Sequence, residues 1–329
     1  MIPPNSSPWE SRIWREELAR AYRSSNELLR DLDLPEEPDH DNPFRTLVPR
    51  PFVARMTKGD RQDPLLLQVL ATDRELIDVD GFTSDPLQEA NATRAPGLIQ
   101  KYAHRALLIT TSGCAVNCRY CFRRHFPYQD HRPNNLEEAI EALRQDTSIE
   151  EIILSGGDPL LLGDEQFAEL LDRLSSIAHI ERIRIHTRLP IVLPQRVTSL
   201  LLTTLAQLQK QTIIVVHCNH AAELNEETQR AFALLKTTGI TMLNQAVLLS
   251  GINDSVERQI NLAATLFQQG VLPYYLHLPD PISGTHHFYI DEPTAMDLHA
   301  KIHARLPGYL VPRLVKEIAG EAGKRLISG

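Results

Sequence analysis

The feature that most constrains the fold of this chain is a series of six short apolar runs, each followed by an amphipathic stretch. The runs are rich in isoleucine, valine and leucine, and they span residues 106–111, 151–157, 182–187, 212–218, 241–249 and 273–279. In the stretches that follow them, apolar residues recur every three or four positions, as on one face of a helix. Six strand–helix units in series predict an α/β fold in which helices cover a parallel sheet. Right-handed connections would curve that sheet, so we expect a partial (α/β)6 barrel of the TIM type.

The repeated units do not account for the whole chain. Residues 1–100 contain short helical patterns among many prolines and charged residues, and they are predicted to form an N-terminal helical extension. Residues 101–290 are predicted to form the barrel core, and residues 291–329 a C-terminal helix followed by a short tail. In barrels of this kind the loops after the strands gather at one end and carry the chemistry. Residues that follow the strands are therefore expected to converge at one mouth.

Charge and hydropathy argue against several classes of protein. The chain carries 34 Lys and Arg against 42 Asp and Glu, a net charge of −8. This balance does not suit a nucleic-acid-binding protein that relies on overall basic charge, or a basic membrane-surface protein. The first residues lack the basic and apolar regions of a secretory signal, and no run approaches the roughly 18 apolar residues that cross a bilayer. We therefore expect a cytoplasmic protein with no nucleic-acid and no membrane partner.

Three of the four cysteines lie close together, directly after the first predicted strand. Cys114, Cys118 and Cys121 are separated by three and then two residues, so three thiolates on one short loop can bind a metal centre. An iron–sulfur cluster held by three thiolates keeps one iron open to a small molecule, and we favour this interpretation. The alternatives are a zinc site with His125 as fourth ligand, or three ordinary cysteines. Cys218, far from the others in sequence, is expected to be a buried thiol.

The motif CxxxCxxC after the first strand of such a chain resembles the radical SAM superfamily. The wider run GCAVNCRYCFRRHFPY at residues 113–128 closely resembles the lysine 2,3-aminomutase family, and within it the enzymes that make (R)-β-lysine for modification of bacterial elongation factor P. The resemblance extends from about residue 63 to residue 324. It implies an isomerase that transfers an amino group within L-lysine to give β-lysine. It also implies three cofactors: a [4Fe–4S] cluster, S-adenosylmethionine (SAM) and pyridoxal 5′-phosphate (PLP).

A glycine-containing turn follows the second predicted strand. It consists of Ser155, Gly156, Gly157 and Asp158. The glycines let the main chain approach a ligand closely, and Asp158 offers a carboxylate to an ammonium group. By itself such a turn is more often only a tight loop. The resemblance implies that it holds the methionine amino group of SAM, whose reductive cleavage yields the 5′-deoxyadenosyl radical that starts the reaction.

A single lysine near the C-terminus, Lys324, would ordinarily be a solvated surface charge. The resemblance implies that it forms the Schiff base with PLP and releases the cofactor to the substrate amine. Lys101 and Arg105, just before the first predicted strand, match positions that bind the PLP phosphate in the family. The residues alone would favour a pair of surface cations. A nucleotide-binding P-loop is excluded, because Arg325 stands where that motif requires serine or threonine.

Lysine has a carboxylate at one end and an ammonium group at the other, so its site requires both a cation and carboxylates. Arg123, shortly after the cysteine motif, matches the family's carboxylate-binding arginine. Asp280 matches one of two acids that bind the distal ammonium, and the second falls at Glu317, where better-known members have aspartate. His217 and Gln245 end the fourth and fifth predicted strands. They are expected at the same mouth, where they contact a cofactor or serve only the structure.

The family also implies partners. These are L-lysine as substrate, an external one-electron reductant of the flavodoxin or ferredoxin type, and a functional link to a lysine ligase that loads the product onto elongation factor P. The sequence leaves a homo-oligomer open. Two alternatives remain for the function. One is an enzyme of the same superfamily that acts on another amino acid or without PLP. The other is a non-enzymatic iron–sulfur or zinc protein that senses redox state or binds a partner.

Overall fold

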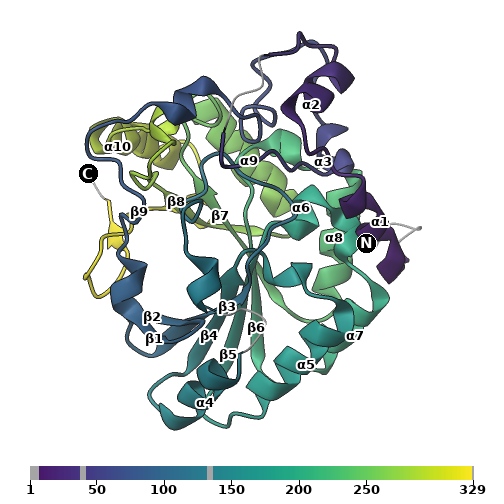
Figure 1. The fold of residues 1–329 in the computed structure, drawn as a ribbon, viewed down its shortest axis with the longest axis vertical. Helices are drawn as coiled ribbons and strands as arrows, with labels where there is room; N and C mark the ends of the chain where they lie inside the picture. The colour runs from purple at the N-terminus through teal and green to yellow at the C-terminus, as the bar shows by residue number, and fades with distance from the viewer. Residues whose placement is uncertain (1–6, 38–41, 132–135, 328–329) are drawn as a thin grey trace.

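One curved sheet forms the centre of the molecule in the computed structural model, which describes residues 7–37, 42–131 and 136–327 (Figure 1). Its ten strands are ordered β1 to β10, so that each is hydrogen-bonded to the next in sequence. The middle six are parallel: β3 (Arg105–Thr111), β4 (Glu151–Gly156), β5 (Arg182–Thr187), β6 (Gln211–Val216), β7 (Thr241–Val247) and β8 (Leu272–His277). They coincide with the six apolar runs of the sequence. The predicted partial (α/β)6 barrel is therefore confirmed.

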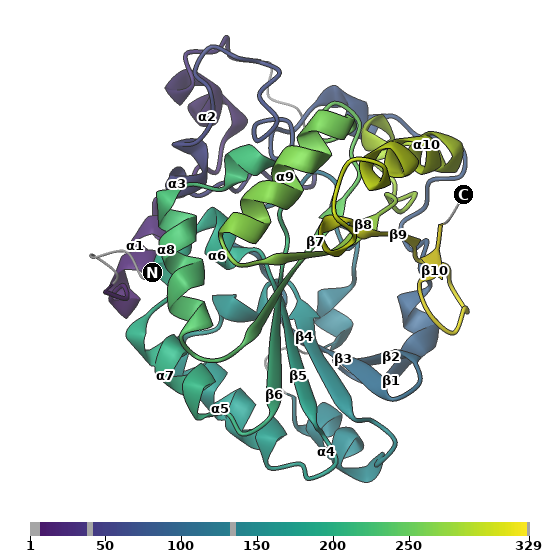
Figure 2. The ribbon, with the colours of Figure 1, turned by 180° about the vertical axis from the view of Figure 1, so that it is seen from behind.

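Helices cover the outer face of these strands (Figures 1 and 2). They are α4 (Glu137–Gln145), α5 (Asp164–Ser175), α7 (Ser199–Gln207), α8 (Glu226–Lys236), α9 (Val256–Gln268) and α10 (Glu292–His303), with the single-turn α6 (Leu189–Val192) after β5. Helix α5 shows how the sequence directs this packing. Its Phe167, Leu171 and Leu174 are spaced four and three residues apart and are all buried in the main hydrophobic core. Ile152 of β4 and Ile183 of β5 belong to the same core, which lies between helices and sheet.

Four short strands extend the sheet at its two edges. They are β1 (Thr93–Ala95) and β2 (Leu98–Tyr102), which precede β3, and β9 (Arg313–Lys316) and β10 (Arg325–Leu326), which follow β8. Strand β2 crosses the expected boundary between residues 100 and 101, so the sheet begins before that boundary. Strands β9 and β10 are antiparallel and pair Lys316 with Arg325, which places Glu317 opposite Lys324.

The N-terminal residues form α1 (Ser11–Ala19), α2 (Ser25–Asp31) and α3 (Arg50–Val53). In both views these helices lie on the side of the molecule that carries α6 and α8. The chain that follows them reaches the cysteine loop, where the main-chain N–H of Arg119 donates to the carbonyl of Gln68 at 2.8 Å. The N-terminal segment thus supports the cysteine loop directly. None of the helices in the described part of the chain is both long and apolar enough to span a membrane.

Candidate active site

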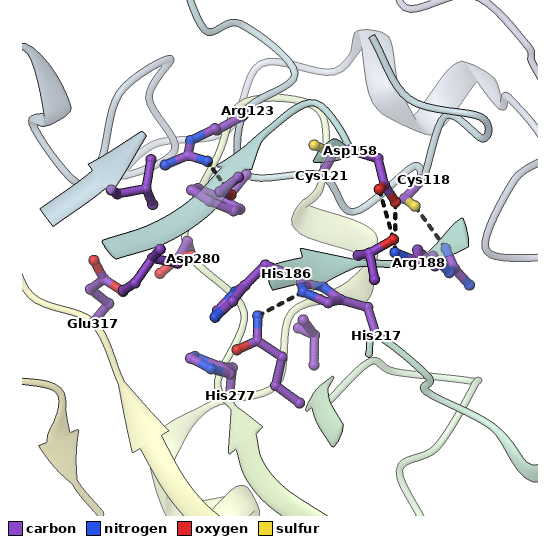
Figure 3. Close-up of a pocket in the computed structure, with 18 of the residues that line it drawn as sticks. Cys118, Cys121, Arg123, Asp158, His186, Arg188, His217, His277, Asp280 and Glu317 are labelled. Atoms are coloured by element: carbon purple, nitrogen blue, oxygen red, sulfur yellow. Dashed lines mark hydrogen bonds between the residues drawn. The ribbon is translucent and has the colours of Figure 1, made fainter. Parts of the chain in front are cut away.

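A cavity of about 330 Å³ lies inside the curve of the sheet. All the site residues predicted from the sequence line it: Lys101, Arg105, Cys114, Cys118, Cys121, Arg123, Ser155, Gly156, Gly157, Asp158, His217, Gln245, Asp280, Glu317 and Lys324. Figure 3 shows Cys118 and Asp158 on one side of this cavity and Asp280 and Glu317 on the other, with His186 and His217 between them. The fold therefore brings together the cysteine motif, the glycine turn and the C-terminal lysine.

The three cysteines of the motif are half-buried thiols on the loop after β3. Burial raises the pKa of the Cys114 thiol and raises the pKa of Cys121 to about 11, and the neighbouring cysteines add to both effects. Thiolates at this position are therefore favoured only when a positive centre is bound to them. Three sulfur donors on one loop fit a [4Fe–4S] cluster that keeps one iron open.

A single metal ion is a poorer match to the same loop. Among the described residues, no three His, Cys, Asp or Glu side chains are arranged to hold one ion. The thiolates of a cluster bind different irons, so they need not converge on one point. His125, the fourth ligand of the zinc alternative, places its Nε2 3.1 Å from the Ser283 carbonyl oxygen. Cys218 is fully buried, as expected.

A buried carboxylate from the N-terminal segment fixes the cysteine loop. Glu75 accepts hydrogen bonds from Arg119 Nε at 2.8 Å and from Arg124 Nη2 at 2.6 Å, and it also pairs with Arg119 Nη2. Both guanidinium groups lie over the ring of Phe44. Burial raises the pKa of Glu75, but the two arginines outweigh burial and lower it. Arg119 and Arg124 thus share one counter-charge, on a residue that sequence reasoning missed.

A second buried arginine lies beside the cysteine motif. Arg188, the residue after β5, donates from Nη1 to the Sγ atom of Cys118 at 2.7 Å (Figure 3). Its Nη2 donates to Gln68 at 2.7 Å and to Glu223 at 2.9 Å. A guanidinium held in this way stabilises negative charge on the sulfur atom. Sequence reasoning missed Arg188, although its place directly after the third parallel strand marks it as a residue of the barrel mouth.

The glycine turn after β4 packs tightly against the cysteine loop. A side chain at Gly157 would overlap the backbone of Gly113. Gly156 has φ +116°, and a Cβ atom there would lie 2.7 Å from the Thr111 carbonyl oxygen. Both glycines are therefore required by the contact between two loops of the protein. The Gly156 carbonyl accepts a hydrogen bond from the Tyr128 hydroxyl at 2.7 Å.

The Asp158 side chain is bound by groups of the protein itself. Its carboxylate accepts four hydrogen bonds of 2.7–3.1 Å, from the Thr187 hydroxyl and from the main-chain N–H groups of Leu160, Arg188 and Leu189. Four bonds use the acceptor positions of a carboxylate. Asp158 therefore fixes the loop that carries Arg188, and its expected contact with the ammonium of SAM stays a prediction.

Alternating charges connect the cysteine loop with the C-terminal tail. Arg123 donates to Glu89 from Nε at 2.8 Å and from Nη2 at 2.9 Å. Lys101 lies between Glu89 and Glu317, with its Nζ 3.0 and 2.8 Å from their carboxylate oxygens. Glu317 also pairs with Lys324. We call these five residues the ion-pair chain.

The ion-pair chain places Lys101 between acids. Its ammonium group is held between two carboxylates, and its expected contact with the PLP phosphate stays a prediction. Burial raises the pKa of Glu89, but Arg123 and Lys101 outweigh burial and hold the pKa at about 2. Burial likewise raises the pKa of Glu317, and Lys324 and Lys101 lower it further than burial raises it. Glu89 lies outside the repeated strand–helix units, so the pattern gave no signal for it.

Asp280 follows β8 and completes an acidic corner of the cavity. Its carboxylate makes no hydrogen bond or ion pair with another residue of the described ranges, and it lies near Glu317 (Figure 3). Burial and the charge of Glu317 raise the pKa of Asp280 to about 7. A cation bound beside it would favour the ionised form. Asp280 and Glu317 together therefore suit an ammonium group.

Arg105, at the start of β3, is not paired with any acid of the described residues. Its guanidinium lies over the ring of Tyr102, 4.6 Å from the centroid. Arg184 of β5 lines the same cavity. Burial lowers the pKa of Arg184, and the charge of Arg105 lowers it further, while Tyr274 opposes the change. Arg184 is also paired with Glu151 of β4. The unpaired cation of Arg105 suits a phosphate dianion, which fits its expected role, and Arg184 adds a second cation nearby.

Three half-buried histidines line the middle of the cavity. They are His186 of β5, His217 after β6 and His277 of β8. His217 Nε2 is 3.0 Å from Gln245 Nε2, whereas Nε2 of His186 and of His277 has no hydrogen-bond partner within the described residues. Burial lowers the pKa of all three rings, that of His217 to about 3. Neutral imidazoles can hydrogen-bond a ligand without adding charge.

The alternation of apolar and polar residues in β5 could have revealed two further residues that line the cavity, Arg184 and His186. Ile183 and Ile185 are fully buried in the core, whereas Arg184 and His186, which alternate with them, line the cavity. Successive side chains of a strand point to opposite faces, so polar residues that alternate with core residues face the interior of the barrel. The sequence RIRIHT thus contained the signal.

Comparisons with known proteins agree with this site. The family model described as the radical SAM superfamily matches residues 108–263. The L-lysine 2,3-aminomutase of Haemophilus influenzae is 44% identical and covers 99% of this chain and 98% of its own length. The L-lysine 2,3-aminomutases of Escherichia coli and Buchnera aphidicola are 43% and 44% identical, over 94% and 96% of this chain and 93% and 95% of their own. A cavity with three clustered cysteines and a tail lysine, together with these identities over nearly full length, leads to one conclusion: the chain belongs to the L-lysine 2,3-aminomutase family of radical SAM enzymes.

Proposed function

We propose that this enzyme converts L-α-lysine to β-lysine by intramolecular transfer of the amino group from carbon 2 to carbon 3. One observation carries the proposal. Lys324 and its partner Glu317, from the C-terminal tail, line the same cavity as the three cysteines of the loop after β3. The cysteines that would hold the cluster and the side chain of Lys324, which would hold a carbonyl cofactor, therefore border one cavity and can act on one substrate. The relatives named L-lysine 2,3-aminomutase support this assignment.

The cysteine side of the cavity would hold the cluster and SAM. On one-electron reduction, the bound pair supplies a 5′-deoxyadenosyl radical, which removes a hydrogen atom from the substrate. Cys114, Cys118 and Cys121 hold the cluster, and Arg188 stabilises charge on Cys118. The main chain at Gly156 forms the adjoining wall. His186, which is neutral and without a hydrogen-bond partner in the described structure, is available to a polar group of the ligand.

The opposite side would hold PLP and the substrate. PLP, when bound to an amine, supplies a conjugated system across which nitrogen can move between neighbouring carbons, and it spreads the unpaired electron. Lys324 binds the cofactor at rest, and Arg105 with Arg184 neutralises the phosphate. Asp280 and Glu317 bind the distal ammonium of lysine. Before the cofactor binds, Lys324 is paired with Glu317.

We further propose that the product is (R)-β-lysine and that it serves the β-lysylation of elongation factor P in the cytoplasm. The support is the similarity of the cysteine run at residues 113–128 to enzymes of that branch. The reaction needs an external one-electron reductant of the flavodoxin or ferredoxin type. A separate lysine ligase would consume the product.

The decisive experiment is anaerobic incubation of reconstituted protein with SAM, PLP, dithionite and L-lysine, followed by chiral analysis of the amino acids. We expect β-lysine, and 5′-deoxyadenosine only when the reductant is present. Cys118→Ala should abolish both products, whereas Lys324→Ala should abolish β-lysine alone. A panel of other amino acids under the same conditions identifies a different substrate. Absence of 5′-deoxyadenosine from a cluster-loaded sample would instead favour a redox sensor.

A further inference from the structure

We infer that Glu89 is a positioning residue for the carboxylate of the substrate, acting through Arg123. The inference rests on the proposed function, in which Arg123 binds that carboxylate. Glu89 lies in a short 3-10 helix (Glu89–Ala92) before β1 and is almost fully buried. Neither the repeated barrel units nor the cysteine motif includes it. Its position between Arg123 and Lys101 in the ion-pair chain nevertheless connects it to both ends of the cavity.

Arg123 is confined in every direction except one. A guanidinium has five N–H donors, and three of them are used here. Nε and Nη2 donate to the two oxygens of Glu89, and Nη1 donates to the Ser155 hydroxyl at 3.0 Å. The rings of Phe122 and Phe126 lie 4.8 and 5.4 Å from the guanidinium carbon. One N–H on Nη1 and one on Nη2 remain, which is the number that a carboxylate takes in a two-bond contact.

Glu89 is itself held rigidly. Its main-chain N–H donates to the Asp85 carboxylate at 3.2 Å, and its carbonyl accepts from the Thr93 hydroxyl at 3.2 Å. One oxygen of its carboxylate is also 3.0 Å from Lys101 Nζ. The orientation of Arg123 is therefore set by a fixed main chain and a fixed counter-charge. The binding edge is formed before the substrate arrives, which reduces the cost of ordering it.

Replacing Glu89 with glutamine removes the charge and turns one acceptor into a donor. The new amide group would face N–H groups of Arg123 or Lys101, so at least one of the present contacts becomes repulsive. Arg123 then loses the two-bond contact that fixes its plane. The effect should be specific to ligands that carry a carboxylate, because the variant leaves the side chains of Asp280 and Glu317, which bind the ammonium group, unchanged.

Two ligands that differ in the carboxylate test this specificity. Protein loaded with PLP and cluster, without SAM, is titrated calorimetrically with L-lysine and with 1,5-diaminopentane, which lacks the carboxylate. Glu89→Gln should weaken L-lysine binding by roughly 10- to 100-fold, the effect of losing one hydrogen bond to a charged group. Binding of the diamine should stay within about twofold. Arg123→Gln should give the same pattern, and the double variant should bind L-lysine no more weakly than Arg123→Gln alone.

Two further variants secure the interpretation. Glu257→Gln removes an exposed ion pair with Arg305 and should leave both affinities unchanged. Glu89→Asp keeps the charge on a shorter side chain, so it should weaken L-lysine binding selectively but less than Glu89→Gln, and it serves if the glutamine variant does not fold. Equal weakening of both ligands, or no weakening of either, would overturn the inference alone. Failure of the unmodified protein to bind L-lysine would overturn the proposed function, and this inference with it.

Discussion

Replacing Glu75 with glutamine should destabilise the protein strongly. Glu75 and Arg119 are fully buried, and Arg124 is nearly so. The variant leaves two guanidinium groups beside each other without a counter-charge. Breaking a buried ion pair on one side costs about 3–5 kcal/mol. That is a large part of the roughly 5–15 kcal/mol that stabilises a typical domain. The same loss should loosen the cysteine loop, because Arg119 and Arg124 lie on either side of Cys121.

The measurement is urea unfolding of cofactor-free protein under anaerobic conditions, followed by circular dichroism, with iron content measured after reconstitution. Glu257→Gln is the matched control: its ion pair is exposed, so its unfolding free energy should stay close to that of the parent. The pKa of Glu75 is lowered in the folded state. Its stabilisation is therefore complete above the unfolded pKa of ~4.3 and is lost as pH falls through the folded pKa, so the two proteins should converge in acid. A Glu75→Gln variant within 1 kcal/mol of the parent at pH 7 would falsify the reasoning.

Four further predictions concern the cavity. Lys324→Ala should remove the pyridoxal absorbance of the loaded protein while SAM cleavage continues, which spectrophotometry and 5′-deoxyadenosine analysis measure together. Arg188→Gln should lower the reduction potential of the cluster by roughly 60 mV, because the positive charge beside Cys118 stabilises the reduced state. A shift of ~59 mV corresponds to a tenfold change in the equilibrium constant for one electron. An unchanged potential in an EPR-monitored titration would contradict this prediction. The pKa of Asp280 is raised to about 7, and only its ionised form attracts an ammonium group. The affinity for lysine should therefore fall as the pH drops below about 7. Calorimetric titrations of Asp280→Asn should no longer show this pH dependence. Arg105→Gln should weaken PLP binding by about tenfold or more in fluorescence titrations, since it removes a charged contact to phosphate.

The central sheet could be predicted because its strands are long, apolar and regularly spaced. Strands β1, β2, β9 and β10 could not, because they have two to five residues and mixed polarity. Strand β10 forms only by pairing with β9, and this pairing depends on chain contacts that no local pattern records. The same reason explains why the position of Glu317 opposite Lys324 emerged from the structure.

The candidate site shows a similar division. Cys114, Cys118 and Cys121 are close in sequence, so their spacing indicated a cluster directly. For Asp158 the sequence indicated contact with a ligand but not the hydrogen bonds that its carboxylate accepts from main-chain N–H groups of the loop after β5. Glu89 gave no signal at all, because its significance depends on Arg123 and Lys101 being brought to it by the fold. Sequence spacing therefore identifies chemistry within one loop better than contacts between loops.

The support of the cysteine loop by Glu75 and Gln68 has a consequence for biosynthesis. A ribosome delivers the chain from its N-terminus, so both supporting residues emerge before the loop that they hold. Glu317 and Lys324 emerge only after the whole barrel sequence. Two supports of the cysteine loop are therefore synthesised before the loop itself, whereas the lysine proposed to bind pyridoxal phosphate is synthesised only when translation is nearly finished.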